Sequence, residues 1–157
     1  MSVQEPVEIL SSRVYAFART DVFAAFADPA LLALWWGPDG FTNVIHEFEF
    51  RPGGTWLLTM TASNGSDFLN RSTFGQIVVP ERICFTHHDP LHVFDMEMQF
   101  DVVSVNASRL TWRMQMEPND ENIRLAKFIA LANEQNFDRL EAVLQQKSPA
   151  DFISNDR

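Results

Sequence analysis

The sequence contains a single cysteine, Cys84, among its 157 residues. One cysteine can form neither an internal disulfide nor a multi-cysteine zinc site, and it suits a reducing compartment. A chain of this length buries about 70% of the surface that its unfolded form exposes, so its core needs no covalent or metal staple. We expect one domain over residues 1–147. A flexible tail is expected over residues 148–157.

Basic residues are scarce as well. The chain has 12 Lys and Arg against 21 Asp and Glu, which gives a formal net charge of −9. A negative surface repels phosphate groups, so nucleic acids and anionic membranes are poor partners. No apolar run approaches the ~20 residues of a membrane helix, and the first residues lack the basic start and apolar run of a secretory signal. We therefore expect a cytoplasmic protein that binds neither nucleic acid nor membrane.

Familiar catalytic and cofactor motifs are also missing. The sequence has no GxSxG, P-loop, HExxH or glycine-rich dinucleotide motif, so we expect no cofactor, and the catalytic residues, if any, are unknown. Cys84 lies in an expected strand, with no helix N-terminus to lower its pKa, and is expected to be inert. His87 and His88 follow it closely, but neighbouring strand residues face opposite sides, which argues against a shared metal.

The pattern of apolar residues predicts an α+β fold. Residues 8–17 are expected to form a strand, and two short helices follow before Gly37. From residue 41 to 116 apolar and polar side chains alternate between turn sequences, which predicts six antiparallel strands. Residues 120–146 contain no Gly or Pro and predict a helix about 40 Å long.

One face of the predicted sheet is apolar and the other is charged. Along residues 94–102, for example, the apolar side chains alternate with Asp, Glu and Gln. The long helix offers a matching apolar stripe, formed by Leu125, Ala126, Ile129, Ala130, Phe137, Leu140 and Leu144. The simplest assembly is a curved antiparallel sheet that grips its C-terminal helix.

Five polar side chains share these inward faces. The alternation directs His46 inward with Phe48 and Phe50, and it directs a further set inward, namely Asn70, Ser72, His87 and Asn133. A buried polar group costs about 1–3 kcal/mol if it is unpaired. The set is therefore either a group of internally hydrogen-bonded core residues or a group of polar anchors in a ligand cavity. Five inward methionines fit both alternatives, because methionine fills cores and adapts to ligands.

Several segments together resemble a known family. They are residues 35–42 with Trp-Trp-Gly-Pro, 46–56 with Arg-Pro-Gly-Gly, 80–83, 109–114 and 134–140. The chain resembles the SRPBCC (START-like) superfamily over residues 12–146, and more narrowly the branch named for the activator of the heat shock protein 90 ATPase. Glu49 stands where that branch usually has Asp. The resemblance implies a helix-grip fold with seven antiparallel strands, two short helices after the first strand and a long C-terminal helix.

The resemblance also implies a function, because the superfamily typically holds an apolar ligand between sheet and helix. We expect binding of a small, mostly hydrophobic ligand by a carrier or sensor. The alternatives are an enzyme that uses the same cavity, as polyketide cyclases of the superfamily do, and a co-chaperone of a heat-shock ATPase. The expected site has an apolar body formed by Trp56, Phe74, Met96, Met98, Trp112 and Phe137, and polar anchors formed by His46, Asn70, His87 and Asn133.

Two further expectations concern aromatic and apolar residues outside this set. Of the adjacent Trp35 and Trp36, one is expected in the core and the other at an entrance to the interior. Phe128 and Leu131 fall on or near the polar face of the 120–146 helix. They are either isolated exposed residues or part of a homodimer interface.

Overall fold

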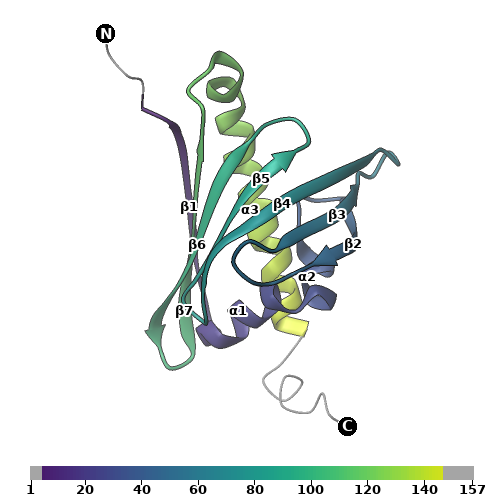
Figure 1. Ribbon diagram of the computed structural model, residues 1–157. Helices are drawn as coiled ribbons and strands as arrows, with labels where there is room; N and C mark the ends of the chain where they lie inside the picture. The colour runs from purple at the N-terminus through teal and green to yellow at the C-terminus, as the bar shows by residue number, and fades with distance from the viewer. Residues whose placement is uncertain (1–4, 147–157) are drawn as a thin grey trace.

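The computed structural model describes residues 5–146, and in these residues the predicted α+β helix-grip fold is confirmed (Figure 1). The elements in chain order are β1 (Val7–Tyr15), α1 (Arg19–Ala27), α2 (Pro29–Trp35), β2 (Thr42–Phe48), β3 (Thr55–Thr61), β4 (Asp67–Val78), β5 (Arg82–Asp89), β6 (Phe94–Ser104), β7 (Ala107–Met116) and α3 (Asp120–Gln146). The predicted tail over residues 148–157 lies outside the described residues. Within the described part of the chain, no helix has the length and apolarity needed to span a membrane.

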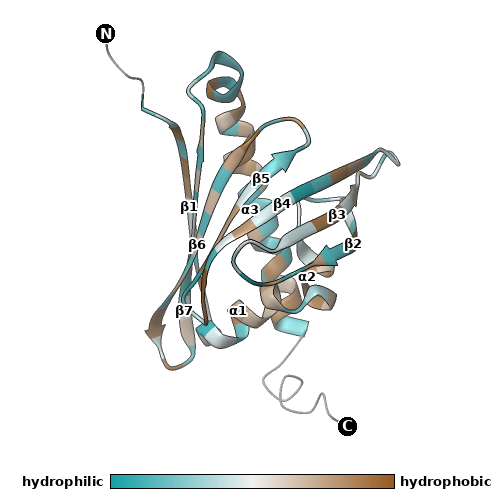
Figure 2. Ribbon diagram, viewed as in Figure 1, coloured by the Kyte–Doolittle hydropathy of each residue, from teal (hydrophilic) through white to brown (hydrophobic). Residues whose placement is uncertain are grey.

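The seven strands form one antiparallel sheet in the order β1-β7-β6-β5-β4-β3-β2. α3 crosses one face of this sheet, and α1 and α2 pack beside the C-terminal end of α3 (Figure 1). Figure 2 shows hydrophobic and hydrophilic residues alternating along the strands. This alternation gives the sheet one apolar face, and α3 covers that face.

The C-terminal half of α3 supplies most of its buried contacts. Phe137, Leu140 and Leu144 are almost fully buried, whereas the predicted stripe residues nearer the start of the helix, including Leu125 and Ile129, are only partly buried. α3 is therefore anchored firmly at one end and packs more loosely at the other.

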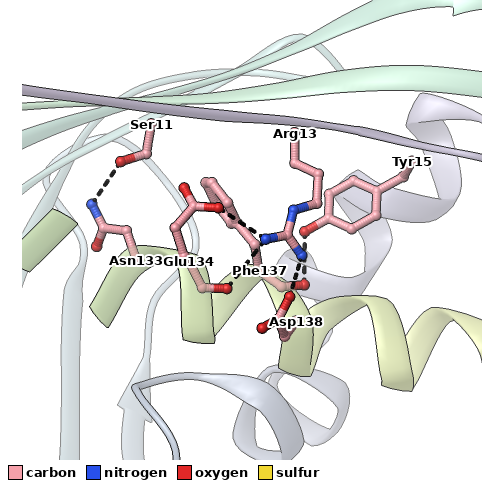
Figure 3. A network of polar contacts seen from close by, with 7 residues as sticks. All are labelled: Ser11, Arg13, Tyr15, Asn133, Glu134, Phe137 and Asp138. Atoms are coloured by element: carbon pink, nitrogen blue, oxygen red, sulfur yellow. Dashed lines mark hydrogen bonds and ion pairs between the residues drawn. The ribbon is translucent and has the colours of Figure 1, made fainter. Parts of the chain in front are cut away.

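A polar network fastens the edge strand β1 to α3 (Figure 3). The Arg13 guanidinium lies 2.6 Å from Asp138 Oδ1 and 2.9 Å from Glu134 Oε1, and it also stacks over the Phe137 ring at 5.5 Å. The buried Tyr15 hydroxyl donates a 2.9 Å hydrogen bond to the Phe137 carbonyl. These contacts fix the position of α3 over the sheet and so define one wall of the space between them.

The prediction that His46 points inward is wrong, and a β-bulge is the reason. Ile45 pairs with Leu58 and Glu47 pairs with Leu57, so His46 is an extra residue without a partner on β3. An extra residue reverses the alternation along the strand. His46 is exposed, and its Nε2 lies 2.8 Å from the hydroxyl of Thr59 on the outer side of the sheet.

Candidate ligand-binding cavity

A cavity of about 310 Å³ lies between the apolar face of the sheet and α3. Strands β3 to β7 form its floor, and Asn133 and Asn136 of α3 form part of its roof. The loop that follows α2 closes one side, and the turn between β5 and β6 closes another. Among the described residues that line it, only His87 and His92 carry side chains that can be charged. The described part of the lining therefore combines mostly apolar side chains with a few polar ones and contains no carboxylate, Lys or Arg.

The structure brings together most of the residues predicted for the ligand site. Those in the cavity lining are Trp56, Asn70, His87, Met96, Trp112 and Asn133. Phe74, Met98 and Phe137 face the same interior but are buried within the core, outside the lining. His46 lies on the other side of the sheet, as described above. A role for the lining residues in binding a ligand stays a prediction.

Sequence reasoning missed several lining residues. Phe41, His92 and Asn136 were not predicted, although Asn136 lies one helical turn from Asn133 and this spacing could have shown it. Phe41 lies just before β2 and His92 lies in the turn between β5 and β6, so no strand alternation indicates where their side chains point. Of the adjacent tryptophans, Trp35 is buried in the core as expected, and Trp36 lines the cavity, while its place at an entrance stays a prediction.

The loop after α2 is held by side chains of α3. The Asn136 amide group donates to the Trp35 carbonyl at 2.8 Å and accepts from the Gly37 N–H at 3.2 Å. The Arg139 guanidinium donates to five backbone carbonyls, those of Leu34, Trp36, Gly37, Pro38 and Phe41, at 2.8–3.3 Å. This wall of the cavity is therefore fixed by hydrogen bonds rather than by apolar packing alone.

Glycine suits position 37 because of its backbone conformation. Its φ of +95° lies in the left-handed region that side chains disfavour. An added Cβ would also lie 2.6 Å from the Met60 Cε, the movable end of a flexible side chain. The Trp-Trp-Gly-Pro sequence thus allows the backbone to turn sharply and approach β3. The turn directs Trp36 toward the interior of the protein.

Polar side chains in the cavity are partly paired with the protein. The Asn133 amide donates to the hydroxyl of Ser11 at 3.2 Å (Figure 3), and the Asn70 amide donates to the Phe68 carbonyl at 3.0 Å. Each amide oxygen can still accept a hydrogen bond from a bound molecule. These hydrogen bonds agree with the first alternative left by the sequence, and the role of the same groups as ligand anchors stays a prediction.

His87 lies where β5 reaches the cavity mouth. Its Nε2 donates to the Pro90 carbonyl at 3.1 Å, and its ring stacks on Phe94 with centroids 4.8 Å apart. Burial lowers the pKa of His87, and the neighbouring His92 lowers it further, although the Pro90 hydrogen bond acts in the opposite direction. Burial also lowers the pKa of His92. Both rings are therefore neutral at pH 7, and Nδ1 of His87 remains an acceptor.

We expect the stability of the protein to fall as the pH drops below 6.5, the ordinary pKa of histidine. Below that value the unfolded chain takes up protons that the folded His87 and His92 resist, so acid favours unfolding. Urea unfolding at about pH 7.5 and about pH 5.5 measures the effect. His87→Phe should weaken this pH dependence, because it removes one of the two buried rings. An equal pH dependence in wild type and His87→Phe would contradict the burial argument.

Within residues 5–146, no three His, Cys, Asp or Glu side chains gather closely enough to share a metal ion. Cys84 faces the opposite side of the sheet from the cavity, beside Glu97. Partial burial raises the pKa of the Cys84 thiol, and the charge of Glu97 raises it further. This agrees with the expectation of an unreactive cysteine.

A curved antiparallel sheet that grips a C-terminal helix, with an apolar cavity between them, defines the helix-grip class of ligand-binding domains. The sequence model of one family in this class, described as "Activator of Hsp90 ATPase homolog 1-like protein", matches residues 16–145. The chain belongs to this family, in agreement with the resemblance found in its motifs.

Solved structures share the fold at low sequence identity. The AHSA1 protein from Silicibacter pomeroyi is 20% identical, with a TM-score of 0.77 over 90% of this chain and 100% of that chain. A protein from Arthrobacter aurescens is 21% identical, with a TM-score of 0.81 over 88% and 86%. One from Chromobacterium violaceum is 25% identical, with a TM-score of 0.72 over 87% and 96%. A comparison with curated proteins found no match.

Proposed function

We propose that this protein binds a small, mostly apolar molecule in the cavity between the sheet and α3, as a carrier or sensor. The observation that carries the proposal is the cavity itself, which has a volume of about 310 Å³ and a largely aromatic and methionine lining. Ligand sites in proteins typically start at about 300 Å³ and combine an apolar lining with a few polar groups. Asn70, His87 and Asn133 supply such groups here.

An enzymatic use of the same cavity is the second candidate, and His87 favours it. A neutral imidazole with a free Nδ1 at a cavity mouth can accept a proton from a bound substrate. Chemical conversion of a bound molecule, measured after incubation with the protein, would favour this candidate over binding alone. The loss of that turnover in His87→Phe, with binding retained, would assign the role of base to His87.

A co-chaperone role is the third candidate, and it rests on the description of the family alone. It requires a partner surface rather than the cavity. Adding the purified protein to a heat shock protein 90 homologue and measuring ATP hydrolysis tests it. An increase in ATPase rate that survives blocking of the cavity would favour this role over ligand binding.

Filling the cavity should abolish binding without unfolding the protein. In Asn70→Phe a large ring replaces a polar side chain in the lining beside Phe68. We expect the affinity for the neutral fluorescent probe N-phenyl-1-naphthylamine to fall roughly tenfold or more, since the added ring occupies the space of the probe. Probe fluorescence and the urea midpoint are measured on the same samples.

The matched control is Leu69→Phe, at the preceding residue of β4. Leu69 is 56% exposed and faces away from the cavity, so this variant adds an aromatic ring to the same strand on the opposite side. Its probe affinity should equal that of wild type. Equal losses in both variants would show that the probe binds elsewhere and would argue against the proposed site.

The homodimer remains a proposal that accompanies this function. Phe128 and Leu131 are 70% and 64% exposed on α3, and Ile123 is exposed nearby. Light scattering at high protein concentration tests whether this apolar surface joins two copies. A monomer mass that does not rise with concentration would rule out the dimer and leave the binding proposal intact.

A further inference from the structure

Two buried hydrogen-bond donors in the cavity wall have no partner. Among the described residues, the indole N–H groups of Trp56 and Trp112 are buried without an acceptor. Both side chains line the cavity, and they are only 1% and 2% exposed. The N–H of Trp35, in contrast, donates to the Ala25 carbonyl at 2.9 Å. The unpaired indole donors therefore belong to two tryptophans that line the cavity, whereas the core residue Trp35 has its N–H paired.

Unpaired buried donors are rare because each costs free energy. Most buried polar groups in proteins have a partner, and a donor without one loses its hydrogen bonds to water and gains nothing in return. A bound molecule that presents an acceptor to either indole would remove that penalty. A hydrocarbon of the same shape would leave it in place. The cavity therefore favours ligands that accept hydrogen bonds at this wall.

Trp36 packs against the rings that carry both donors. Its ring centroid lies 5.0 Å from that of Trp56 and 5.4 Å from that of Trp112. Trp36 also lines the cavity and is only partly buried, so it has more freedom to adjust to a ligand than the two rings that it contacts. Because both N–H groups are buried, a ligand atom that binds them needs neighbouring side chains to adjust.

The absence of a cationic side chain decides the kind of acceptor. None of the described lining residues is a Lys or Arg, and the two histidines are neutral at pH 7. A carboxylate or phosphate would lose its hydration in the cavity without gaining an opposite charge. A carbonyl oxygen accepts hydrogen bonds and carries no charge, so it meets both conditions. The surrounding aromatic rings suit an aromatic body.

We propose that the ligand is an uncharged aromatic carbonyl compound whose oxygen accepts a hydrogen bond from the indole N–H of Trp56 or Trp112. This inference rests on the proposed binding function and specifies the chemical class of its ligand.

A pair of matched probes tests the inference. In 2-acetylnaphthalene the side group carries a carbonyl oxygen, and in 2-isopropenylnaphthalene a CH₂ group takes the place of that oxygen. Equilibrium dialysis against wild type should show roughly tenfold tighter binding of the acetyl compound, although the hydrocarbon leaves water more readily. Equal binding, or tighter binding of the hydrocarbon, would overturn the inference.

Variants identify the donor. Trp56→Phe and Trp112→Phe each keep an aromatic ring and remove the N–H, and one of them should bring the affinity ratio of the two probes close to one. Trp35→Phe removes an N–H that is already paired outside the cavity, so the ratio should stay at its wild-type value. If the double variant Trp56→Phe, Trp112→Phe keeps the wild-type ratio of affinities for the two probes, the inference is overturned.

A measurement on wild type alone covers the case in which these variants fail to fold. In a ¹H–¹⁵N spectrum, the acetyl compound should shift an indole N–H resonance of Trp56 or Trp112 downfield, and the isopropenyl compound should not. If both naphthalenes and N-phenyl-1-naphthylamine fail to bind, the proposed function fails. If the probes bind but the carbonyl gives no advantage and no downfield shift, only the present inference fails.

Discussion

Replacing Phe137 with alanine should lower the free energy of unfolding by roughly 3–5 kcal/mol, the usual loss for a fully buried aromatic residue. Phe137 is 0% exposed, and its ring meets Trp112 edge to face with centroids 4.8 Å apart. On its other side lies the guanidinium of Arg13. The residue therefore joins α3 to both the sheet and the edge strand. Urea unfolding followed by circular dichroism measures the loss.

Phe128→Ala is the matched control on the same helix. Phe128 is 70% exposed, so its removal should change the free energy of unfolding by no more than about 0.5 kcal/mol. A small effect at Phe137, comparable to that at Phe128, would mean that α3 does not pack on the sheet as described.

The second large effect is expected at Arg139. Arg139→Met keeps a long apolar side chain but removes the Arg139 hydrogen bonds to five backbone carbonyls, one near the end of α2 and four in the loop that follows it. The carbonyls of Trp36 and Pro38 keep a second donor. We expect a loss of about 3 kcal/mol in the free energy of unfolding, because hydrogen bonds to a charged group are worth more than neutral ones. Affinity for N-phenyl-1-naphthylamine should fall as well, since Trp36 and Phe41 lose their fixed positions in the cavity wall.

Arg71→Met controls for the removal of an arginine as such. Arg71 lies 2.9 Å from Asp89, and both side chains are more than half exposed. Exposed ion pairs contribute little, so this variant should lose less than about 1 kcal/mol and keep its probe affinity. If Arg139→Met unfolds at the same urea concentration as Arg71→Met, the loop is not held by Arg139.

The fold could be predicted from the sequence because its signals are local and repeated. Alternation from residue 41 to 116 indicated the strands, and the absence of Gly and Pro from residue 120 to 146 indicated the long helix, which the structure places at Asp120–Gln146. The apolar stripe on that helix indicated that the helix packs on the apolar face of the sheet, since both surfaces must leave water. Each of these signals depends on one element or on two that pack directly together.

The site could be predicted only in part, and His46 and Phe74 show why. Alternation identifies the face of a strand, so a single extra residue at His46 was enough to reverse the prediction. Alternation also does not tell whether an inward side chain is packed in the core or borders a cavity. Phe74, in the packed core, and Met96, in the cavity wall, were therefore predicted in the same way. Phe41 lies in the loop after α2, where its carbonyl accepts a hydrogen bond from Arg139, and no local pattern in the sequence indicates that contact.

The most direct test of ligand binding in the cavity is a ¹H–¹⁵N NMR titration of the labelled protein with N-phenyl-1-naphthylamine. The chain has four tryptophans, and Trp36, Trp56 and Trp112 line the cavity. We predict saturable shifts of these three indole resonances, with the backbone amide of Cys84 on the opposite face unchanged. Shifts that do not saturate, or that are confined to the outer sheet face or to the exposed surface around Phe128, would contradict a binding site between the sheet and α3.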